Sequence, residues 1–256
     1  MLHVTLFSIR SMSLQAMNIE VLADSESVAQ RAASIIAEEA WEAIARRGIF
    51  VMGVSGGQTP WLMLRDLAAM GIPWRAVHIV QVDERVAPEG HPDRNLTHLR
   101  ESLLSHAPLP PEQIYSMPVE SADLERAAAD YAQTLRRIAG QPTVLDLAHL
   151  GLGADGHTAS LVPDDPVLDV DDADVALSGP YQGHRRMTLT YPILNRARKI
   201  LWVVTGGEKA EMCRRLLAGY DSIPAGHICR DRAFVVADCA AAERAHSLTK
   251  EEVICA

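Results

Sequence analysis

The sequence predicts an α/β protein in which helices cover both faces of a mostly parallel sheet, a Rossmann-like three-layer arrangement. Short continuous apolar runs, such as 49–54 and 199–204, are typical of buried parallel strands, and they alternate with longer segments of helical spacing. Of the 256 residues, 48% are hydrophobic and 22% are charged, the balance of a folded domain with a sizeable core. Such alternation implies right-handed crossovers within one sheet. We therefore expect one domain over 17–256, preceded by a tail over 1–16.

The first elements show the pattern clearly. Residues 25–47 are rich in alanine with apolar side chains at helical spacing, and Gly48 directly after them is a common helix end. A strand over 49–54 follows at once. The segment SGGQTP then leads into a helix over 61–70, with Pro60 suited to its first turn. Further strands are expected at 77–82, near 114, and at 144–150, 186–190, 199–204 and 233–237, with a polar loop over 83–94 and helices at 95–106, 122–139 and 207–218.

Charge and composition exclude several classes of protein. The chain carries 33 acidic against 24 Lys and Arg residues, a net charge of −9, which disfavours a nucleic acid as partner. No apolar run approaches the roughly 20 residues that span a bilayer, and no secretory signal precedes the domain. The cysteines form no C-x-x-C pair and the histidines no H-E-x-x-H, so no metal is expected. We expect a cytoplasmic monomer or weak homo-oligomer with a small-molecule partner.

The first motif lies between the strand over 49–54 and the following helix. Glycines Gly56 and Gly57 allow backbone N–H groups to turn inward, and the hydroxyls of Ser55 and Thr59 add donors at a helix N-terminus, which together can cradle an anion such as phosphate. Two other interpretations stay open. The segment can be a plain capped turn, and it also matches G-x-S-x-G, the nucleophile elbow of serine hydrolases.

The second motif, Asp83-Glu84-Arg85, follows the strand over 77–82 and precedes the segment HPDRN. Ligands of parallel sheets bind beyond the carboxyl ends of the strands, where these side chains fall. The planar guanidinium of Arg85 suits a phosphate or a developing oxyanion. The alternative is a salt-bridged rim without function.

The third motif, GLGADGHTAS, follows the strand over 144–150 and contains Asp155 and His157. By letter it includes the dinucleotide fingerprint G-x-G-x-x-G, but that fingerprint needs a following helix, and Pro163 interrupts the chain soon afterwards. A neutral histidine can take a proton from water, and a nearby carboxylate can fix its tautomer. The pair is therefore a candidate for general base catalysis.

Two further cations are candidates for a phosphate pocket. Arg186 lies in the strand over 186–190, and Lys209, one of only three lysines in the chain, follows the strand over 199–204. Cationic side chains near the carboxyl edge of the sheet could close on an anion. Both are equally interpretable as ordinary surface cations.

Four segments in fixed order resemble one family. The segments SGGQTP, VDER with HPDRN, LGLGADGHTASLVPD, and RMTLTYPILN with GGEKA together resemble the 6-phosphogluconolactonases, within the superfamily of glucosamine-6-phosphate deaminase and ribose-5-phosphate isomerase. The resemblance runs from Glu20 to Asp238, and GADGHTASLVP is its most specific part. Deaminase relatives typically carry a second acidic residue in the corresponding loop, which this chain lacks. The resemblance implies an isomerase/deaminase-type α/β fold over one lactonase domain.

The resemblance also implies a reaction, the hydrolysis of 6-phospho-D-glucono-1,5-lactone to 6-phosphogluconate in the oxidative pentose phosphate pathway, without metal or organic cofactor. His157, oriented by Asp155, would activate water, and Arg85 would stabilise the oxyanion. The substrate and its phosphate would be held by Ser55, Gly56, Gly57, Thr59, Asp83, Arg186 and Lys209. The alternatives are a Ser55-dependent esterase, a deaminase-like enzyme and a sugar-phosphate sensor without catalysis.

Overall fold

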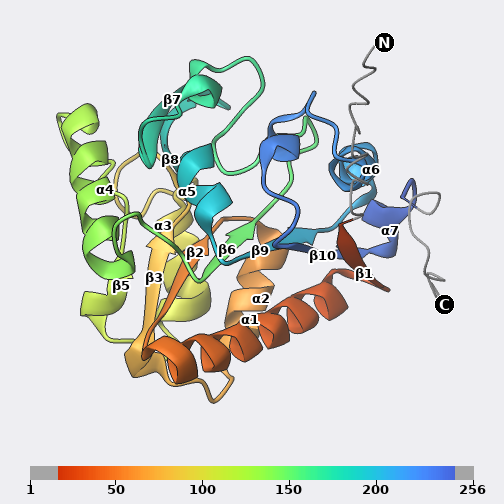
Figure 1. Ribbon diagram of the computed structural model, residues 1–256, viewed down its shortest axis with the longest axis horizontal. Coiled ribbons are helices and arrows are strands. Elements are labelled where there is room, and N and C mark those ends of the chain that lie inside the picture. The colour runs from red at the N-terminus through yellow and green to blue at the C-terminus, as the bar shows by residue number, and fades with distance from the viewer. Residues whose placement is uncertain (1–16, 246–256) are drawn as a thin grey trace, which may run out of the picture.

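The structure is a computed structural model that describes residues 17–245, so the tail expected over 1–16 lies outside the described residues. Its centre is a seven-stranded sheet in the order β1-β10-β9-β6-β2-β3-β5, in which every neighbouring pair runs parallel (Figure 1). The strands are β1 (Asn18–Leu22), β2 (Phe50–Val54), β3 (Val77–Gln81), β5 (Ile114–Tyr115), β6 (Leu147–Leu150), β9 (Lys199–Val204) and β10 (Ala233–Asp238). The mostly parallel sheet predicted from the sequence is confirmed.

Helices cover both faces of this sheet. Alternate residues of β2 show why: Phe50, Met52 and Val54 belong to one apolar cluster, whereas Val51 belongs to the other, because successive strand side chains point to opposite faces. The first cluster packs under α1, α2 and α3, and the second under α4 to α7, so the protein has three layers. The helices are α1 (Ser25–Arg47), α2 (Gln58–Ala68), α3 (Asn95–Leu99), α4 (Leu124–Ala139), α5 (Tyr191–Arg196), α6 (Ala210–Ala218) and α7 (Cys239–Ala242).

Local sequence explains where helix α1 begins and ends. The carboxylate of Asp24 accepts a hydrogen bond from the Ser27 amide at 2.8 Å, which caps the first turn. At the other end Gly48 adopts a φ of +76°, and its amide donates to the carbonyl of Ile44. Only glycine takes this left-handed conformation readily, so the helix predicted over 25–47 ends where the sequence indicates.

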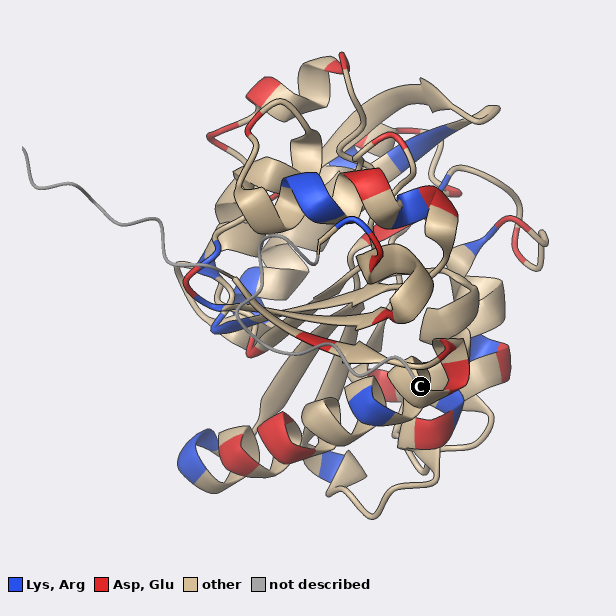
Figure 2. Ribbon diagram, turned by 90° about the vertical axis from the view of Figure 1, so that its right-hand side faces the viewer, with Lys and Arg blue, Asp and Glu red and all other residues tan. Residues whose placement is uncertain are grey.

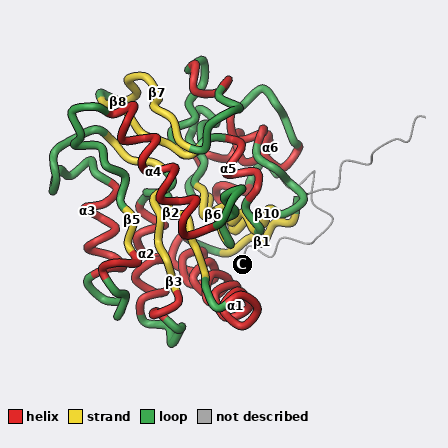
Figure 3. Tube along the Cα trace, turned by 60° about the vertical axis from the view of Figure 1, so that its left-hand side comes forward, coloured by secondary structure: helices red, strands yellow, loops and turns green. Residues whose placement is uncertain are grey.

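A second, three-stranded sheet stands beside the main one, with the antiparallel order β4-β8-β7. Its strands are β4 (Asp83–Arg85), β7 (Val175–Tyr181) and β8 (His184–Leu189). Figure 3 shows β7 and β8 at the end of the molecule opposite α1. The strand expected over 186–190 is therefore real, but it belongs to this sheet. No helix lies between β7 and β8. The two antiparallel strands are joined by a tight turn through Gln182 and Gly183, both at positive φ.

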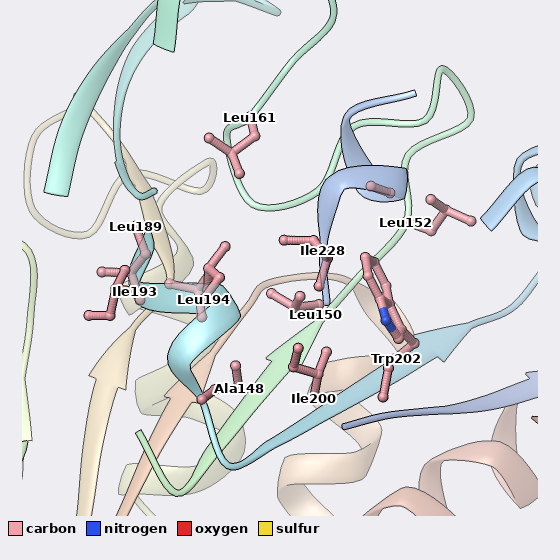
Figure 4. Packing of buried hydrophobic residues seen from close by; sticks show 14 of the residues in the cluster. Ala148, Leu150, Leu152, Leu161, Leu189, Ile193, Leu194, Ile200, Trp202 and Ile228 are labelled. Atoms are coloured by element: carbon pink, nitrogen blue, oxygen red, sulfur yellow. The ribbon is translucent and has the colours of Figure 1, made fainter. Parts of the chain in front are cut away.

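Among the strands and α-helices, the sequence analysis did not predict β1, β4, β7, α5 and α7. The polar loop expected over 83–94 is wrong at its start, because Asp83–Arg85 pairs with β8 as a strand. Helix α5 matters for the site because its Ile193 and Leu194 pack with Leu189 of β8 over Ala148 and Ile200 of the main sheet (Figure 4). All five side chains are fully buried. This cluster fixes the small sheet to the large one, and with it the position of every polar side chain that β8 carries.

Charged residues lie mainly on the outer elements. In Figure 2 red and blue segments are interspersed over the helices, whereas the strands of the main sheet are largely tan. The described part of the chain, residues 17–245, includes no helix with the length and hydropathy needed to cross a membrane.

Candidate active site

The predicted site residues come together in one cleft of about 480 Å³ at the carboxyl edge of the main sheet. Loops after β2, β3, β6 and β9 reach this edge, and β8 of the small sheet closes one side. All of the predicted residues line the cleft except Asp155, whose carboxylate contacts the His157 ring. The lining includes Ser55, Gly56, Gly57, Thr59, Asp83, Arg85, His157, Arg186 and Lys209, together with Asn95, Thr205 and Glu208.

The loop after β2 turns sharply into α2 and places the Ser55 hydroxyl at the cleft without a hydrogen-bond partner. A Cβ atom added at Gly56 would lie 2.1 Å from Asn95 Oδ1, and Gly57 has a φ of +135°, so both positions require glycine. The Ser55 Oγ is buried, lines the cleft and has no hydrogen-bond partner, whereas Thr59 Oγ1 lies 2.7 Å from Thr205 Oγ1. A buried hydroxyl without a partner is costly, and a bound anion would satisfy it.

A buried histidine supports this loop from below. His149 on β6 is fully buried, and burial lowers its pKa to about 3, so the ring is neutral. Its Nδ1 accepts the Ser55 amide at 3.3 Å, which turns that N–H away from the cleft. The Ser55 Oγ has no hydrogen-bond partner, and His149 bonds the Ser55 amide instead. This weighs against the nucleophile elbow, because a serine nucleophile needs a base hydrogen-bonded to its hydroxyl.

Arg85 is held by backbone and side-chain acceptors. Its Nη1 donates to the carbonyl of Asp93 at 2.9 Å and to Asn95 Oδ1 at 2.8 Å, while its Nε is buried without a partner. Asn95 in turn donates to the Asp83 carbonyl at 3.0 Å, and Ser160 Oγ donates to Asp83 Oδ2 at 2.7 Å. The Arg85 side chain is thus fixed at the cleft wall, and its Nε–H remains without an acceptor in the protein.

His157 forms a tight pair with Asp155, as the sequence predicted. His157 Nδ1 lies 2.6 Å from Asp155 Oδ1, and Tyr181 donates its hydroxyl to Asp155 Oδ2 at 2.9 Å. Burial alone would raise the pKa of Asp155, but the charge of His157 and the hydrogen bonds from His157 and Tyr181 hold it below its usual value. Position 153 has no space for a side chain, since a Cβ at Gly153 would lie 2.0 Å from His157 Nδ1.

The remaining two cations, Arg186 and Lys209, also line the cleft. Arg186 is 3% exposed, stacks over the Tyr181 ring at 4.9 Å, and has a buried Nε without a partner. Arg186 pairs with Arg85 across β4 and β8, and burial together with the neighbouring charge of Arg85 lowers the pKa of Arg186. Burial also lowers the pKa of Lys209, whose Nζ donates to the Leu152 carbonyl. Like charges held together in a cleft favour an anionic ligand.

Sequence reasoning missed several residues of the site, among them Asn95, Tyr181, Thr205 and Glu208. Asn95 stands in the HPDRN segment, and its place directly after a charged motif was the available signal. Tyr181 and Thr205 had no local signal, because their partners Asp155 and Thr59 are 26 and 146 residues away along the chain. Within residues 17–245 the side chains able to hold a metal ion together are His91, Asp93 and His184, and these do not line the cleft.

The chain matches one family of known proteins. The family model described as glucosamine-6-phosphate isomerases/6-phosphogluconolactonase matches residues 23–236, so the chain belongs to that family. Similar relatives include 6-phosphogluconolactonases from bacteria and mammals. The one from Synechocystis sp. is 35% identical over 207 residues, covering 79% of this chain and 86% of the relative, and the one from Homo sapiens is 34% identical over 216 residues, covering 80% and 83%.

Solved structures of this family share the fold of the chain. The crystal structure of 6-phosphogluconolactonase from Thermotoga maritima superposes with a TM-score of 0.78 at 25% identity, covering 86% of this chain and 98% of that one. A monomeric glucosamine-6-phosphate deaminase superposes almost as well, with a TM-score of 0.77 at 20% identity, covering 89% of this chain and 100% of that one. The shared fold therefore does not distinguish a lactonase from a deaminase. Only the residues of the site can distinguish the two activities.

Proposed function

We propose that this protein hydrolyses 6-phospho-D-glucono-1,5-lactone to 6-phosphogluconate. The observation that carries the proposal is a cleft that combines an imidazole held by a carboxylate, at 2.6 Å, with three cationic side chains, Arg85, Arg186 and Lys209. Lactone hydrolysis needs a base for water and a stabilised oxyanion, and the substrate's phosphate needs cations. The 6-phosphogluconolactonases to which the chain is similar act on this substrate by name.

In the proposed mechanism the side chain of His157 is the general base. Its Nδ1 is engaged by Asp155, which leaves Nε2 with the free lone pair. Nε2 takes a proton from water while the water oxygen bonds to the lactone carbonyl carbon, and the carbonyl oxygen becomes an oxyanion. The bond from that carbon to the ring oxygen then breaks, and the ring oxygen takes the proton back from Nε2. No cofactor is needed.

The cations have two tasks in this scheme. The guanidinium of Arg85, anchored through Asp93 and Asn95, stabilises the oxyanion, an effect worth a few kcal/mol per well-placed donor. The Ser55 hydroxyl, the N-terminus of α2, Arg186 and Lys209 hold the phosphate. Asp83 accepts from Ser160 and so is placed to orient a sugar hydroxyl at the same wall.

A direct assay compares two activities of one preparation. We expect the purified protein to accelerate lactone opening above its spontaneous rate, and to release no ammonia from glucosamine 6-phosphate. The physical reason is that the 155–160 loop offers one carboxylate, already committed to His157 and Tyr181. Ammonia release, or no acceleration of lactone opening, would contradict the proposal.

Replacing Ser55 distinguishes a phosphate cradle from a serine esterase. We expect Ser55→Ala to keep kcat within a few-fold and to raise KM, because the substitution removes one buried hydroxyl donor. A nucleophilic serine would instead lose on the order of 10⁶-fold in kcat. Steady-state kinetics decide between them, and a loss of that size in kcat would favour the esterase.

Lys209→Met should chiefly raise KM, by roughly 10- to 100-fold, because one hydrogen bond to a charged group contributes about 1.5–3 kcal/mol. Lys199→Met is the matched control, since Lys199 pairs with Glu39 at 2.6 Å and does not line the cleft. Initial rates over a range of lactone concentrations give both parameters. An unchanged KM in Lys209→Met would remove this lysine from the phosphate site.

A further inference from the structure

Three metal-ligand side chains from distant parts of the sequence meet beside the cleft. His91 and Asp93 lie in the loop between β4 and α3, and His184 is the first residue of β8. One ligand atom from each side chain lies within 4.8 Å of the others. His184 Nε2 is 2.9 Å from Asp93 Oδ2, and His91 Nδ1 is 3.8 Å from the same oxygen. Two imidazoles thus face one carboxylate.

We propose that His91, Asp93 and His184 bind one divalent transition-metal ion of the zinc type. Zinc takes imidazole nitrogen and carboxylate oxygen at about 2.0–2.2 Å, so the ligand atoms of a tetrahedral site lie roughly 3.3 Å apart. The observed separations of 2.9 and 3.8 Å lie on either side of that value. Three protein ligands leave the fourth position for water.

The chemistry of the donors selects the class of metal. Imidazole suits zinc, copper, nickel and cobalt, whereas calcium and magnesium prefer sites built from oxygen. The side chains are also accessible, since His91 is 37% and Asp93 56% exposed, so an ion can enter from solvent. Two contacts would be replaced when the ion binds. The Asp93 amide donates to His91 Nδ1 at 3.1 Å, and His184 Nε2 contacts the Asp93 carboxylate, so bonds to the metal would take their place.

The position of the ion connects it to the cleft. The backbone carbonyl of Asp93 accepts from Arg85 Nη1, and His184 stands two residues before Arg186 on β8. An ion would therefore join the loop that anchors Arg85 to the strand that carries Arg186. Because such a cross-link forms only in the folded chain, binding should raise the midpoint of thermal unfolding.

Isothermal titration of protein without a histidine tag tests the site. Zinc chloride should bind with one ion per chain, and cobalt chloride should give the visible absorption of a tetrahedral cobalt centre. His184→Gln and His91→Gln should each weaken zinc binding by at least about tenfold, because even the loss of a group that only orients a metal ligand typically costs 10- to 100-fold. His106→Gln is the matched control, because His106 is exposed and outside the cluster, and it should bind zinc as the unsubstituted protein does.

The outcome does not depend on the proposed reaction, since binding is measured without substrate. Absence of zinc binding, or binding that survives both His184→Gln and His91→Gln, would overturn the site. Circular dichroism checks that each variant is folded. If His184→Gln unfolds, Asp93→Asn provides the same comparison from the carboxylate side.

Discussion

His157→Ala is expected to lower kcat for lactone hydrolysis on the order of 10²- to 10⁴-fold while leaving KM within a few-fold. The imidazole is placed to move the proton of the attacking water, whereas the phosphate is held by other groups. The folded state should be retained, because His157 is partly exposed and its loop is fixed by backbone bonds, such as the Gly153 amide to the His157 carbonyl at 2.8 Å. Initial rates, corrected for spontaneous hydrolysis, measure the loss.

Two companion variants sharpen this test. His106→Ala removes an exposed histidine away from the cleft and should leave kcat unchanged. Asp155→Asn keeps the shape of the side chain but removes the charge that stabilises the imidazolium, so kcat should fall less than in His157→Ala. If His157→Ala turns over the lactone as fast as the unsubstituted protein, the general base is another group.

Glu84→Gln is expected to cost about 3–5 kcal/mol in the free energy of unfolding, because it leaves a buried guanidinium without its close counter-charge. Glu84 is fully buried and Arg94 is 2% exposed, with Arg94 Nε 3.1 Å from Glu84 Oε2 in an ion pair that lacks hydrogen-bond alignment. Glu120, 3.8 Å from Arg94 Nη1, keeps the loss toward the lower end of that range.

Glu84 also organises the site, which adds to its effect. Its carboxylate accepts from the backbone amides of Arg85, Asn95 and Leu96, at 2.8 to 2.9 Å. These bonds fix the start of α3 and the residue that holds the Arg85 guanidinium. Glu84→Gln should therefore lower lactonase activity as well as stability.

Urea unfolding measures the loss, and two controls interpret it. Glu42→Gln breaks an exposed pair with Arg46 and should change stability by no more than about 1 kcal/mol. Combining Glu84→Gln with Arg94→Met should cost less than the sum of the single changes, because the unpaired charge is then absent. Strict additivity would show that the two side chains do not stabilise each other.

Most of the main sheet could be predicted because its strands carry a local signal. The strands β2, β3, β6, β9 and β10 are short, mostly apolar and mostly buried, and helices of clear spacing separate most of them. Strand β1 is half-exposed at the sheet edge, and β7 alternates irregularly, so neither stands out from a loop. A short helix such as α5 gives too few turns for its spacing to be recognised.

The candidate site was predictable where it follows a strand. Ser55, Asp83 and Asp155 were found because parallel strands end at a common edge. That rule places residues at the same edge without saying which of them touch. It could not show that the Ser55 amide bonds to His149, nor that Tyr181 completes the pair of Asp155 and His157.

The sequence by itself determined the layered fold, the cleft at the carboxyl edge and the residue types that line it, because these depend on the spacing of apolar residues and on the order of strands. Only the tertiary structure decided the contacts between distant segments. Arg85 lies beside Arg186 because β4 pairs with β8, and His184 meets Asp93 across 91 residues of chain. Such contacts depend on how the small sheet packs on the large one, and no local pattern encodes that packing.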